Sequence, residues 1–281
     1  MRIGTVQNLW RCPVKSMHGE SLNATHIGPL GFAGDRGYAL RDERAGEIRG
    51  AKKLTGLLHF AARYLEPPTD THLPPVEVTL PDRTTVRTDD PTVHTKISQA
   101  LGHEVTLWPR QPPENLDHYR RAPGAFDALP EMLALEPGEP PPSFEGLPPE
   151  IMQYVAPLGT YFDAFPIHFL TTASLRVLSS QYPDGQFAPE RFRPNLLIAA
   201  EDGSSVEEAW NGKILRLGEV ELQVGIPTLR CVMTTLPQGD LPKDPRILRT
   251  IAQHHGRTFG VYATVKRPGE VRVGDPVDLI A

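Results

Sequence analysis

The sequence predicts a β-rich α+β fold, built as a barrel or sandwich of short strands with a few flanking helices. Short runs of alternating or β-branched apolar residues recur along the chain between Gly, Pro and Asp turns. Only two or three segments have helical spacing, and no internal repeat is visible. Many short strands with few helices favour a barrel or sandwich over a doubly wound parallel sheet.

Residues 1–110 are expected to form an N-terminal region of short strands with one helix over 93–101. Pro81-Asp82 should join two of these strands in a hairpin. The expected strands cover 2–9, 22–27, 35–40, 76–80, 84–88 and 105–108.

Residues 111–150 change in character, because they carry 10 of the 30 prolines and keep neither a helical nor a strand period. We expect an irregular linker or lid here.

Residues 151–281 return to regular structure. One helix should begin at Thr171-Thr172 with a threonine as its N-cap, and another should cover 245–255 and end at Gly256. The last two strands should pair with each other, and Gly225 and Pro227 should end the strand that begins at Val220. The expected strands cover 166–170, 192–199, 213–217, 220–224, 259–265, 271–273 and 277–280.

Composition excludes several functional classes. A net charge of −5 and a pI of about 6.1 give no general attraction to nucleic acid or to an anionic membrane, so an anion site needs a local cluster of Lys and Arg. Two cysteines support neither a disulfide framework nor a zinc site. The sequence shows no signal peptide and no apolar run long enough to span a bilayer, so we expect a cytoplasmic location.

Cys231 is the most suggestive single residue, because it should lie just past a strand end and directly after Arg230. A neighbouring cation favours the thiolate, the form that attacks electrophiles and binds metals. The plainer alternative is a small buried hydrophobic residue.

Lys15, Ser16 and Arg36 are candidate anion ligands. Lys15-Ser16 occupies a turn, and Arg36 follows a Gly-rich connection, where a guanidinium can bind an oxyanion in bidentate fashion. The alternatives are a solvated turn and a surface Asp35–Arg36 pair.

Two further groups are candidates. Thr171, Thr172 and Ser174 stand where a strand passes into a helix, a natural phosphate site, although simple capping explains them equally. Arg191 and Arg193 alternate at the expected start of a strand and could share one face, and Asn195 offers a donor and an acceptor to a heterocycle edge. Gly-rich dinucleotide, Walker, HExxH and GxSxG motifs are missing from the sequence.

Taken together, these segments resemble the MOSC family, the molybdenum-cofactor sulfurase C-terminal domain. The similarity is greatest to its amidoxime-reducing members, which carry an N-terminal β-barrel region. The segments that carry the resemblance are Cys12-Pro-Val-Lys-Ser16, Gly31-Phe-Ala-Gly-Asp-Arg36, Phe192-Arg-Pro-Asn195, Leu229-Arg-Cys231 with Thr234-Thr235, and 269–277.

The resemblance implies a MOSC-type β-barrel with flanking helices over 151–281, preceded by a β-barrel-like region over 1–110. It also implies a molybdenum cofactor, molybdopterin with Mo, held between the two. Lys15, Ser16 and Arg36 would hold its phosphate end, with Thr171, Thr172 and Ser174 adding contacts from the helix start. Arg193 and Asn195 would bind the pterin, Arg230 would flank the metal, Cys231 would ligate it, and Tyr262 would line the pocket.

The reaction that the resemblance implies is two-electron reduction of a small N-hydroxylated or related N–O or S–O compound. Because the sequence has no flavin or NAD motif, electrons would come from a separate electron-transfer protein of ferredoxin or flavoprotein type. Two alternatives stay open. Cys231 could carry sulfur as a persulfide, or the chain could be a non-catalytic carrier of the cofactor.

Overall fold

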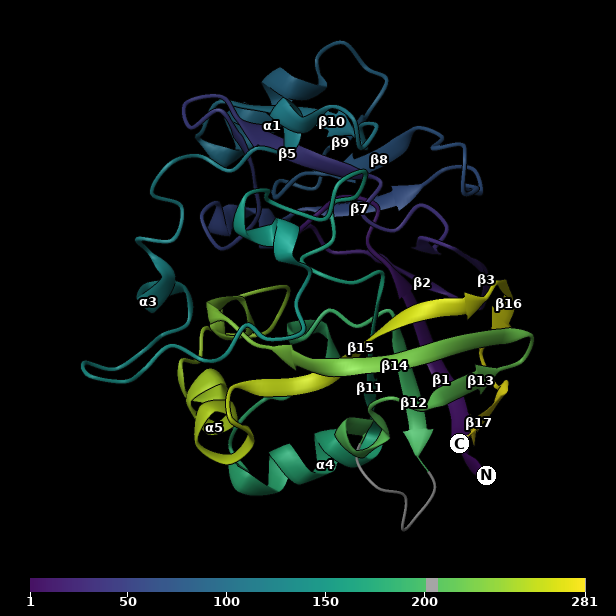
Figure 1. Cartoon of the computed structure of the whole chain (residues 1–281). Coiled ribbons are helices and arrows are strands. Elements are labelled where there is room, and N and C mark those ends of the chain that lie inside the picture. The colour runs from purple at the N-terminus through teal and green to yellow at the C-terminus, as the bar shows by residue number, and fades with distance from the viewer. Residues whose placement is uncertain (201–206, 281) are drawn as a thin grey trace.

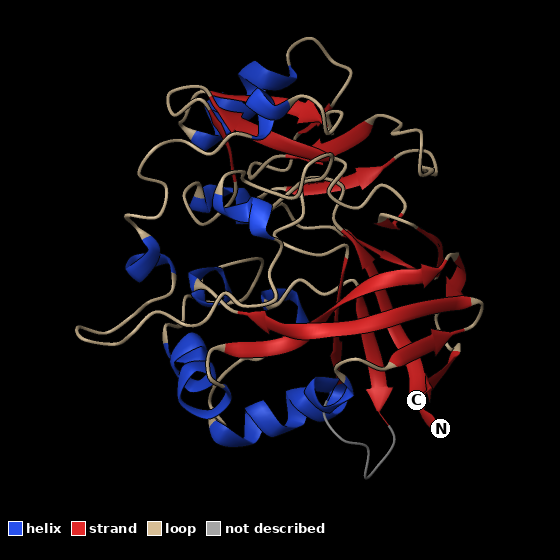
Figure 2. Cartoon of the chain, in the orientation of Figure 1, coloured by secondary structure: helices blue, strands red, loops and turns tan. Residues whose placement is uncertain are grey.

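The computed structural model describes residues 1–200 and 207–280. In Figure 1 two lobes lie one above the other, with a closed barrel and two helices below and smaller sheets above. Figure 2 shows that strands dominate both lobes and that long loops run between them. The expected β-rich α+β fold is confirmed.

The barrel closes through seven strands in the order β12-β11-β15-β14-β13-β17-β1, because β1 pairs with both β17 and β12. Only β11 and β12 run parallel, whereas the other neighbours are antiparallel. The barrel strands are β1 (Arg2–Arg11), β11 (Ile167–Thr171), β12 (Leu196–Ala200), β13 (Ile214–Leu217), β14 (Val220–Leu229), β15 (Thr258–Arg267) and β17 (Pro276–Ile280).

The barrel interior is filled by side chains that alternate inward along these strands. Ile3, Val6 and Leu9 of β1 pack with Phe169 and Trp210 in one buried cluster. Gly4 of β1 allows this strand to approach β12 closely. A Cβ at Gly4 would lie 2.1 Å from the Ala199 carbonyl oxygen, so a side chain does not fit there.

β1 brings the chain's first residues into a barrel made otherwise of residues beyond 166. The Met1 amino group donates to the Leu279 carbonyl at 2.8 Å, and Figure 1 shows both ends of the chain at the same side of the barrel. The division at residue 110 therefore describes sequence segments, whereas the barrel draws on both.

The upper lobe has its own core, in which Val14, Leu40, Leu57 and Ile97 are buried. It contains two three-stranded sheets, β10-β5-β6 and β7-β8-β9, with helix α1 against β10. A third small sheet, β16-β3-β4, lies beside the barrel, and β2 pairs antiparallel with the last residues of β1. Their bounds are α1 (Val93–Leu101), β2 (Glu20–Leu22), β3 (Ala24–Gly28), β4 (Gly31–Phe32), β5 (Tyr38–Asp42), β6 (Glu47–Arg49), β7 (Ala61–Tyr64), β8 (Val76–Thr79), β9 (Thr85–Arg87), β10 (Val105–Pro109) and β16 (Gly269–Arg272).

Residues 111–165 connect the lobes mostly as loop, with two one-turn helices, α2 (Leu116–Tyr119) and α3 (Leu129–Met132). Short 3-10 helices complete the chain: Thr55–His59, Pro149–Met152, Pro189–Arg191, Glu207–Trp210 and Val232–Thr235.

Two longer helices, α4 (Thr172–Gln181) and α5 (Arg246–His255), pack against the barrel. Thr171 caps α4, since its hydroxyl accepts from the Ser174 N–H at 3.1 Å, as predicted. Gly256 ends α5 at a φ of 56°, the left-handed conformation that glycine adopts readily. No described helix is long and apolar enough to cross a membrane.

Three expectations about local structure were wrong. The last two strands do not pair with each other, because β16 pairs with β3 whereas β17 joins β1 and β13. β14 does not end at Gly225 but continues to Leu229. Pro227 is tolerated because the β14–β15 register shifts on both sides of it, so the missing N–H falls at an irregularity of the ladder.

The third error concerns the two arginines expected to share one face of a strand. Arg191 lies in a 3-10 turn, Arg193 has a φ of 55°, and β12 starts only at Leu196. The Arg191 guanidinium donates instead to backbone carbonyls, including those of Gln186 and Pro242.

Candidate functional site

A cavity of about 270 Å³ lies between the lobes and gathers most of the candidate residues. Both lobes and the 111–165 segment line it. The lining includes Lys15, Ser16, Arg36, Arg193, Asn195, Arg230, Cys231 and Tyr262.

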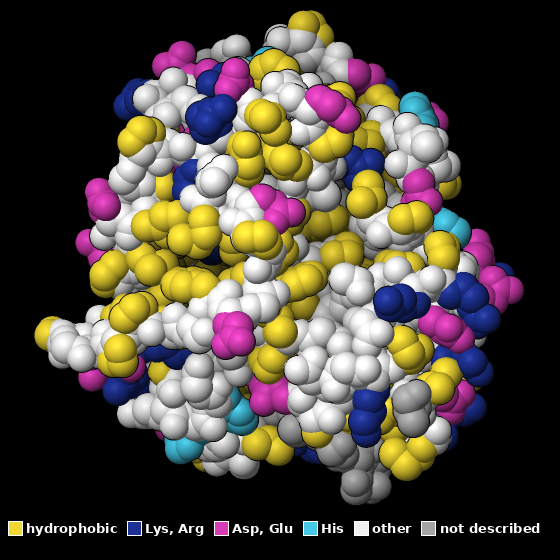
Figure 3. Space-filling model, viewed as in Figure 1, with side chains coloured by type: hydrophobic (Ala, Val, Ile, Leu, Met, Phe, Trp, Pro, Cys, Tyr) yellow, Lys and Arg dark blue, Asp and Glu magenta, His cyan; other side chains and the backbone are white. Residues whose placement is uncertain are grey.

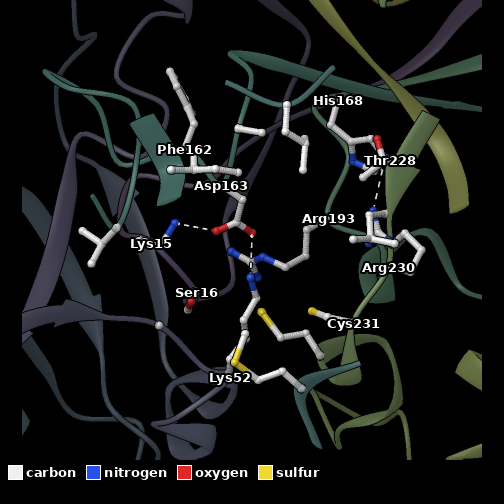
Figure 4. Close-up of a pocket in the computed structure, with 18 of the residues that line it drawn as sticks. Lys15, Ser16, Lys52, Phe162, Asp163, His168, Arg193, Thr228, Arg230 and Cys231 are labelled. Atoms are coloured by element: carbon white, nitrogen blue, oxygen red, sulfur yellow. Dashed lines mark hydrogen bonds and ion pairs between the residues drawn. The ribbon is translucent and has the colours of Figure 1, made fainter. Parts of the chain in front are cut away.

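Cys231 follows the end of β14 by two residues and starts the 3-10 turn Val232–Thr235. Its thiol is free and partly exposed, and Figure 4 shows the sulfur pointing into the cavity from the barrel side. The alternative of a buried hydrophobic residue therefore describes the other cysteine, Cys12, which is 6% exposed.

Lys15 and Ser16 enter the cavity from the turn after β1. The Lys15 ammonium donates to the Tyr161 carbonyl and to the Asp163 carboxylate, both at 2.7 Å. The Ser16 hydroxyl accepts from the Ala51 N–H at 2.9 Å, which leaves its own hydrogen available for a ligand oxygen.

Asp163 is the carboxylate at the centre of this cationic group, as Figure 4 shows. It contacts Lys15 at 2.7 Å and Lys52 at 3.9 Å. Burial alone would raise the pKa of Asp163, but the two ammonium groups hold that pKa far below its usual value. Burial lowers the pKa of Lys15 despite this partner, whereas Asp163 raises the pKa of Lys52.

Asp35 and Arg36 form a buried pair that joins the site to the barrel. Burial opposes the charge of Arg36, but the Asp35 carboxylate outweighs it and raises the arginine pKa. Asp35 also accepts from the Cys12 N–H at 2.7 Å and from the Asn195 amide at 2.8 Å. The Asn195 amide oxygen in turn accepts from the His168 N–H at 3.1 Å, so this side chain already has protein partners at both ends.

Arg193 and Arg230 are held mainly by backbone carbonyls, which do not neutralise their charge. Arg193 donates to the Met17 carbonyl at 2.7 Å and Arg230 to the Phe192 carbonyl at 2.8 Å. The Arg230 Nε and the Thr228 hydroxyl have no protein partner among the described residues. Both residues belong to the cavity lining, and a buried polar atom without a partner calls for an explanation such as a bound group.

Two uncharged groups stand near these cations. Burial, followed by the Arg230 charge, lowers the pKa of His168 well below its usual value, so its imidazole is neutral at physiological pH. Burial raises the pKa of Tyr262 to about 12, which keeps its phenol protonated there.

Backbone strain is concentrated at this site. Six described residues other than glycine have a positive φ, and Ser16, Arg36 and Arg193 are three of them, at 71°, 47° and 55°. Left-handed backbone at such residues costs of order 1 kcal/mol each and often occurs where function fixes a side-chain direction.

The structure does not bring Thr171, Thr172 and Ser174 to the cavity lining. The hydroxyls of Thr171 and Ser174 are buried and both contact the Glu207 carboxylate, whereas Thr172 accepts from the Ala200 N–H at 3.1 Å. Their placement supports the capping alternative.

Many lining residues escaped the sequence analysis, and Asp163, Lys52 and His168 are three that contact the candidate residues. Lys52 belongs to a Lys52-Lys53 doublet, and His168 is a lone polar residue within an apolar strand, which are weak signals. Asp163 follows an aromatic pair in a loop, and no pattern marks it.

Comparison with protein families finds two matching domains. A family model described as the MOSC N-terminal beta barrel domain matches residues 3–111, and one described as the MOSC domain matches residues 159–278.

Similar curated proteins include mitochondrial amidoxime-reducing component 1 of Mus musculus, 32% identical over 133 residues, and its Homo sapiens counterpart, 31% identical over the same length. Each alignment covers 43% of this chain and 38% of the relative, so the matched part spans less than two-fifths of those proteins. Among solved structures, the YUAD protein from Bacillus subtilis aligns over 98% of this chain and 94% of its own, with 11% identity and a TM-score of 0.46.

The two family models lie in tandem and together match most of the chain, including every residue that lines the cavity outside residues 112–158. The chain therefore belongs to the MOSC domain family, with the MOSC N-terminal beta barrel domain in front of the MOSC domain.

Proposed function

We propose that this protein is a molybdenum-cofactor-dependent oxidoreductase that reduces N-hydroxylated or related N–O or S–O compounds. The observation that carries the proposal is a partly exposed thiol, Cys231, in the same cavity as a surplus of cations. A thiolate suits a soft, redox-active metal, and the cations suit an anionic pterin phosphate.

The residues present fit such a group. Thr228 and Arg230 line the cavity, and the Thr228 hydroxyl and the Arg230 Nε have no protein partner among the described residues, while Ser16 keeps a hydrogen to donate. His, Cys, Asp and Glu do not gather in groups of three or more within residues 1–200 and 207–280 in a way that could hold a metal ion. Cys231 would accordingly be the protein's ligand to molybdenum.

Lys15, Ser16 and Arg36 would hold the phosphate, and Arg193 and Arg230 the pterin and the metal side. Asn195 would act by holding Asp35 and the start of β12, because its own polar atoms are engaged. Thr171, Thr172 and Ser174 lie apart from these groups, and we assign them no contact.

When bound, the cofactor supplies a two-electron redox centre beside Cys231. Reduction of an N–OH group breaks the N–O bond and consumes two electrons and two protons, giving N–H and water. Tyr262, protonated at neutral pH, can donate a hydrogen bond to a polar substrate group. The acceptor nitrogen of neutral His168 faces the Arg230 guanidinium at 3.5 Å, so His168 would position Arg230. The electrons come in this proposal from a separate ferredoxin- or flavoprotein-type partner. The curated relatives' name, amidoxime-reducing component, supports the N-hydroxylated substrate class.

The test is metal and pterin analysis of the natively expressed protein, together with amidoxime reduction by an artificial electron donor. We expect about one molybdenum per chain and loss of both metal and activity in Cys231→Ala. Cys12→Ala is the matched control, because Cys12 does not line the cavity.

Metal-free native protein that carries an added sulfur on Cys231 would replace the proposal with sulfur transfer. Protein that holds the cofactor but does not reduce amidoximes would instead be a non-catalytic carrier of the cofactor.

A further inference from the structure

The cavity has a second wall that is almost entirely apolar, and the connection between the lobes supplies it. Ten apolar side chains between residues 121 and 155 line the cavity. Arg121 is the one charged side chain that this part of the connection contributes to the lining. The ten are Ala125, Phe126, Leu129, Met132, Leu133, Phe144, Leu147, Ile151, Met152 and Val155. We call them the apolar wall.

Nine of these ten side chains keep part of their surface accessible, and Leu133 alone is buried. Met152 is 53% exposed. Large apolar side chains in a folded protein are usually buried against one another. The apolar wall therefore leaves accessible hydrophobic surface that a ligand can cover. Figure 3 shows hydrophobic side chains gathered across the waist of the molecule between the lobes.

Specific contacts hold this connection over the cavity. At its start, Arg121 donates to the carbonyls of Ile151 and Tyr154, both at 2.9 Å, and Ala122 donates to Glu47 at 2.8 Å. These bonds tie the beginning of the connection to its end and to β6.

In its middle, Glu139 contacts buried Arg257 at 2.6 Å and Arg249 of α5 at 3.4 Å. Arg257 also donates to the Leu133 carbonyl, and Arg249 contacts Glu136 at 3.2 Å. The apolar wall is therefore fixed at both ends and in the middle.

The two lobes contribute cations to the same cavity, among them Lys15, Arg36, Arg193 and Arg230. These cations suit an anion, whereas the apolar wall suits an apolar body. We infer that the apolar wall binds the hydrocarbon part of the substrate, so the preferred substrates join an N–O head group to a sizeable aliphatic or aromatic body. This inference rests on the proposed function for the head group only.

The physical consequence is a dependence of affinity on chain length. Burying one methylene contributes about 0.8 kcal/mol, which corresponds to about a fourfold lower Kd for each added methylene until the wall is covered. A cavity without an apolar subsite would give the same Kd for short and long members of a series.

The probe is a set of unbranched primary amides from acetamide to octanamide, measured by calorimetry on the cofactor-loaded protein. Amides are neutral, so the cavity cations do not repel them, and they have no N–O bond to reduce. We expect the Kd to fall along the series, and the fall to be at least halved in the double variant Leu147→Asn/Met152→Asn. Leu116→Asn is the matched control, because Leu116 is 40% exposed and lies outside the lining.

A Kd independent of chain length in the parent protein would overturn the inference, as would an unchanged dependence in the folded double variant. If the double variant does not fold, Met152→Asn alone decides, since this exposed side chain can be changed without opening a core. Failure of the inference leaves amidoxime reduction untouched, whereas chain-length-dependent binding without reduction would remove only the proposed function.

Discussion

The Asp35 carboxylate is the clearest point at which one side chain supports both the barrel and the cavity. It has no exposed side-chain surface and accepts from the Cys12 N–H, the Asn195 amide and the Arg36 guanidinium. Asp35→Ala would leave these donors buried without their acceptor and the arginine charge without its partner.

Removing one partner of a buried ion pair costs about 3 to 5 kcal/mol, because the remaining charge keeps its desolvation penalty. That is a large part of the about 5 to 15 kcal/mol that stabilises an ordinary domain. We therefore expect Asp35→Ala to lower the free energy of unfolding by about 3 to 5 kcal/mol. Asp35→Asn should cost nearly as much, because it retains an oxygen but removes the charge.

Urea unfolding, followed by tryptophan fluorescence, measures the effect, since Trp10 and Trp210 both lie in the barrel lobe. The control is Asp89→Ala, which breaks an Asp–Arg pair at 2.7 Å whose side chains are 49% and 53% exposed. Exposed pairs contribute little, so this variant should unfold almost like the parent. Equal losses in the buried and exposed variants, or a loss below about 1 kcal/mol for Asp35→Ala, would refute the reasoning.

Three other perturbations probe different parts of the molecule. Burial holds the pKa of Lys15 below its usual value, so its ammonium group loses its charge at a lower pH than a free lysine does. The affinity for inorganic phosphate, measured by calorimetry, should therefore fall as pH rises on the alkaline side. Lys15→Arg should not show this fall, because a guanidinium keeps its charge there. Burial raises the pKa of Glu207, so the folded state favours its protonated form. The stability of the parent relative to Glu207→Gln should therefore improve as pH falls through that raised pKa in thermal melts, and a difference that does not change with pH would contradict this assignment. Glu139→Ala removes the carboxylate that joins the connection to Arg257, so limited proteolysis should cut residues 125–150 faster than in the parent, whereas an unchanged cleavage rate would show that other contacts suffice.

Local sequence signals predicted most elements of the fold but few of the long-range pairings. The helix over 93–101 and the Thr171 cap follow from periodicity and capping chemistry, and the structure confirms both. The pairing of the last two strands was wrong, because adjacency in sequence favoured a hairpin whereas barrel closure required β17 to join β1. Pro227 misled in a similar way, since no sequence pattern shows where a ladder becomes irregular.

The grouping of several candidate residues could be predicted from the sequence, whereas their roles in binding stay predictions. Cys231 and the cations Lys15, Arg36, Arg193 and Arg230 do line one cavity. Asp163 and His168 were missed because their importance comes from neighbours distant in sequence. The apolar wall was missed because its residues follow neither a helical nor a strand period. The sequence of this connection showed only that it is rich in proline.

The way β1 completes the barrel has a consequence for dissecting this protein. A fragment limited to the MOSC match, residues 159–278, would lack strand β1. The backbone edges of β12 and β17 that pair with β1 would then have no partner strand. Such open edges invite aggregation, so the fragment should be soluble only when a peptide spanning residues 1–12 is supplied to fill the gap. The same arrangement makes the protein a candidate for splitting into two complementing pieces, because β1 and β17 pair although they lie at opposite ends of the sequence.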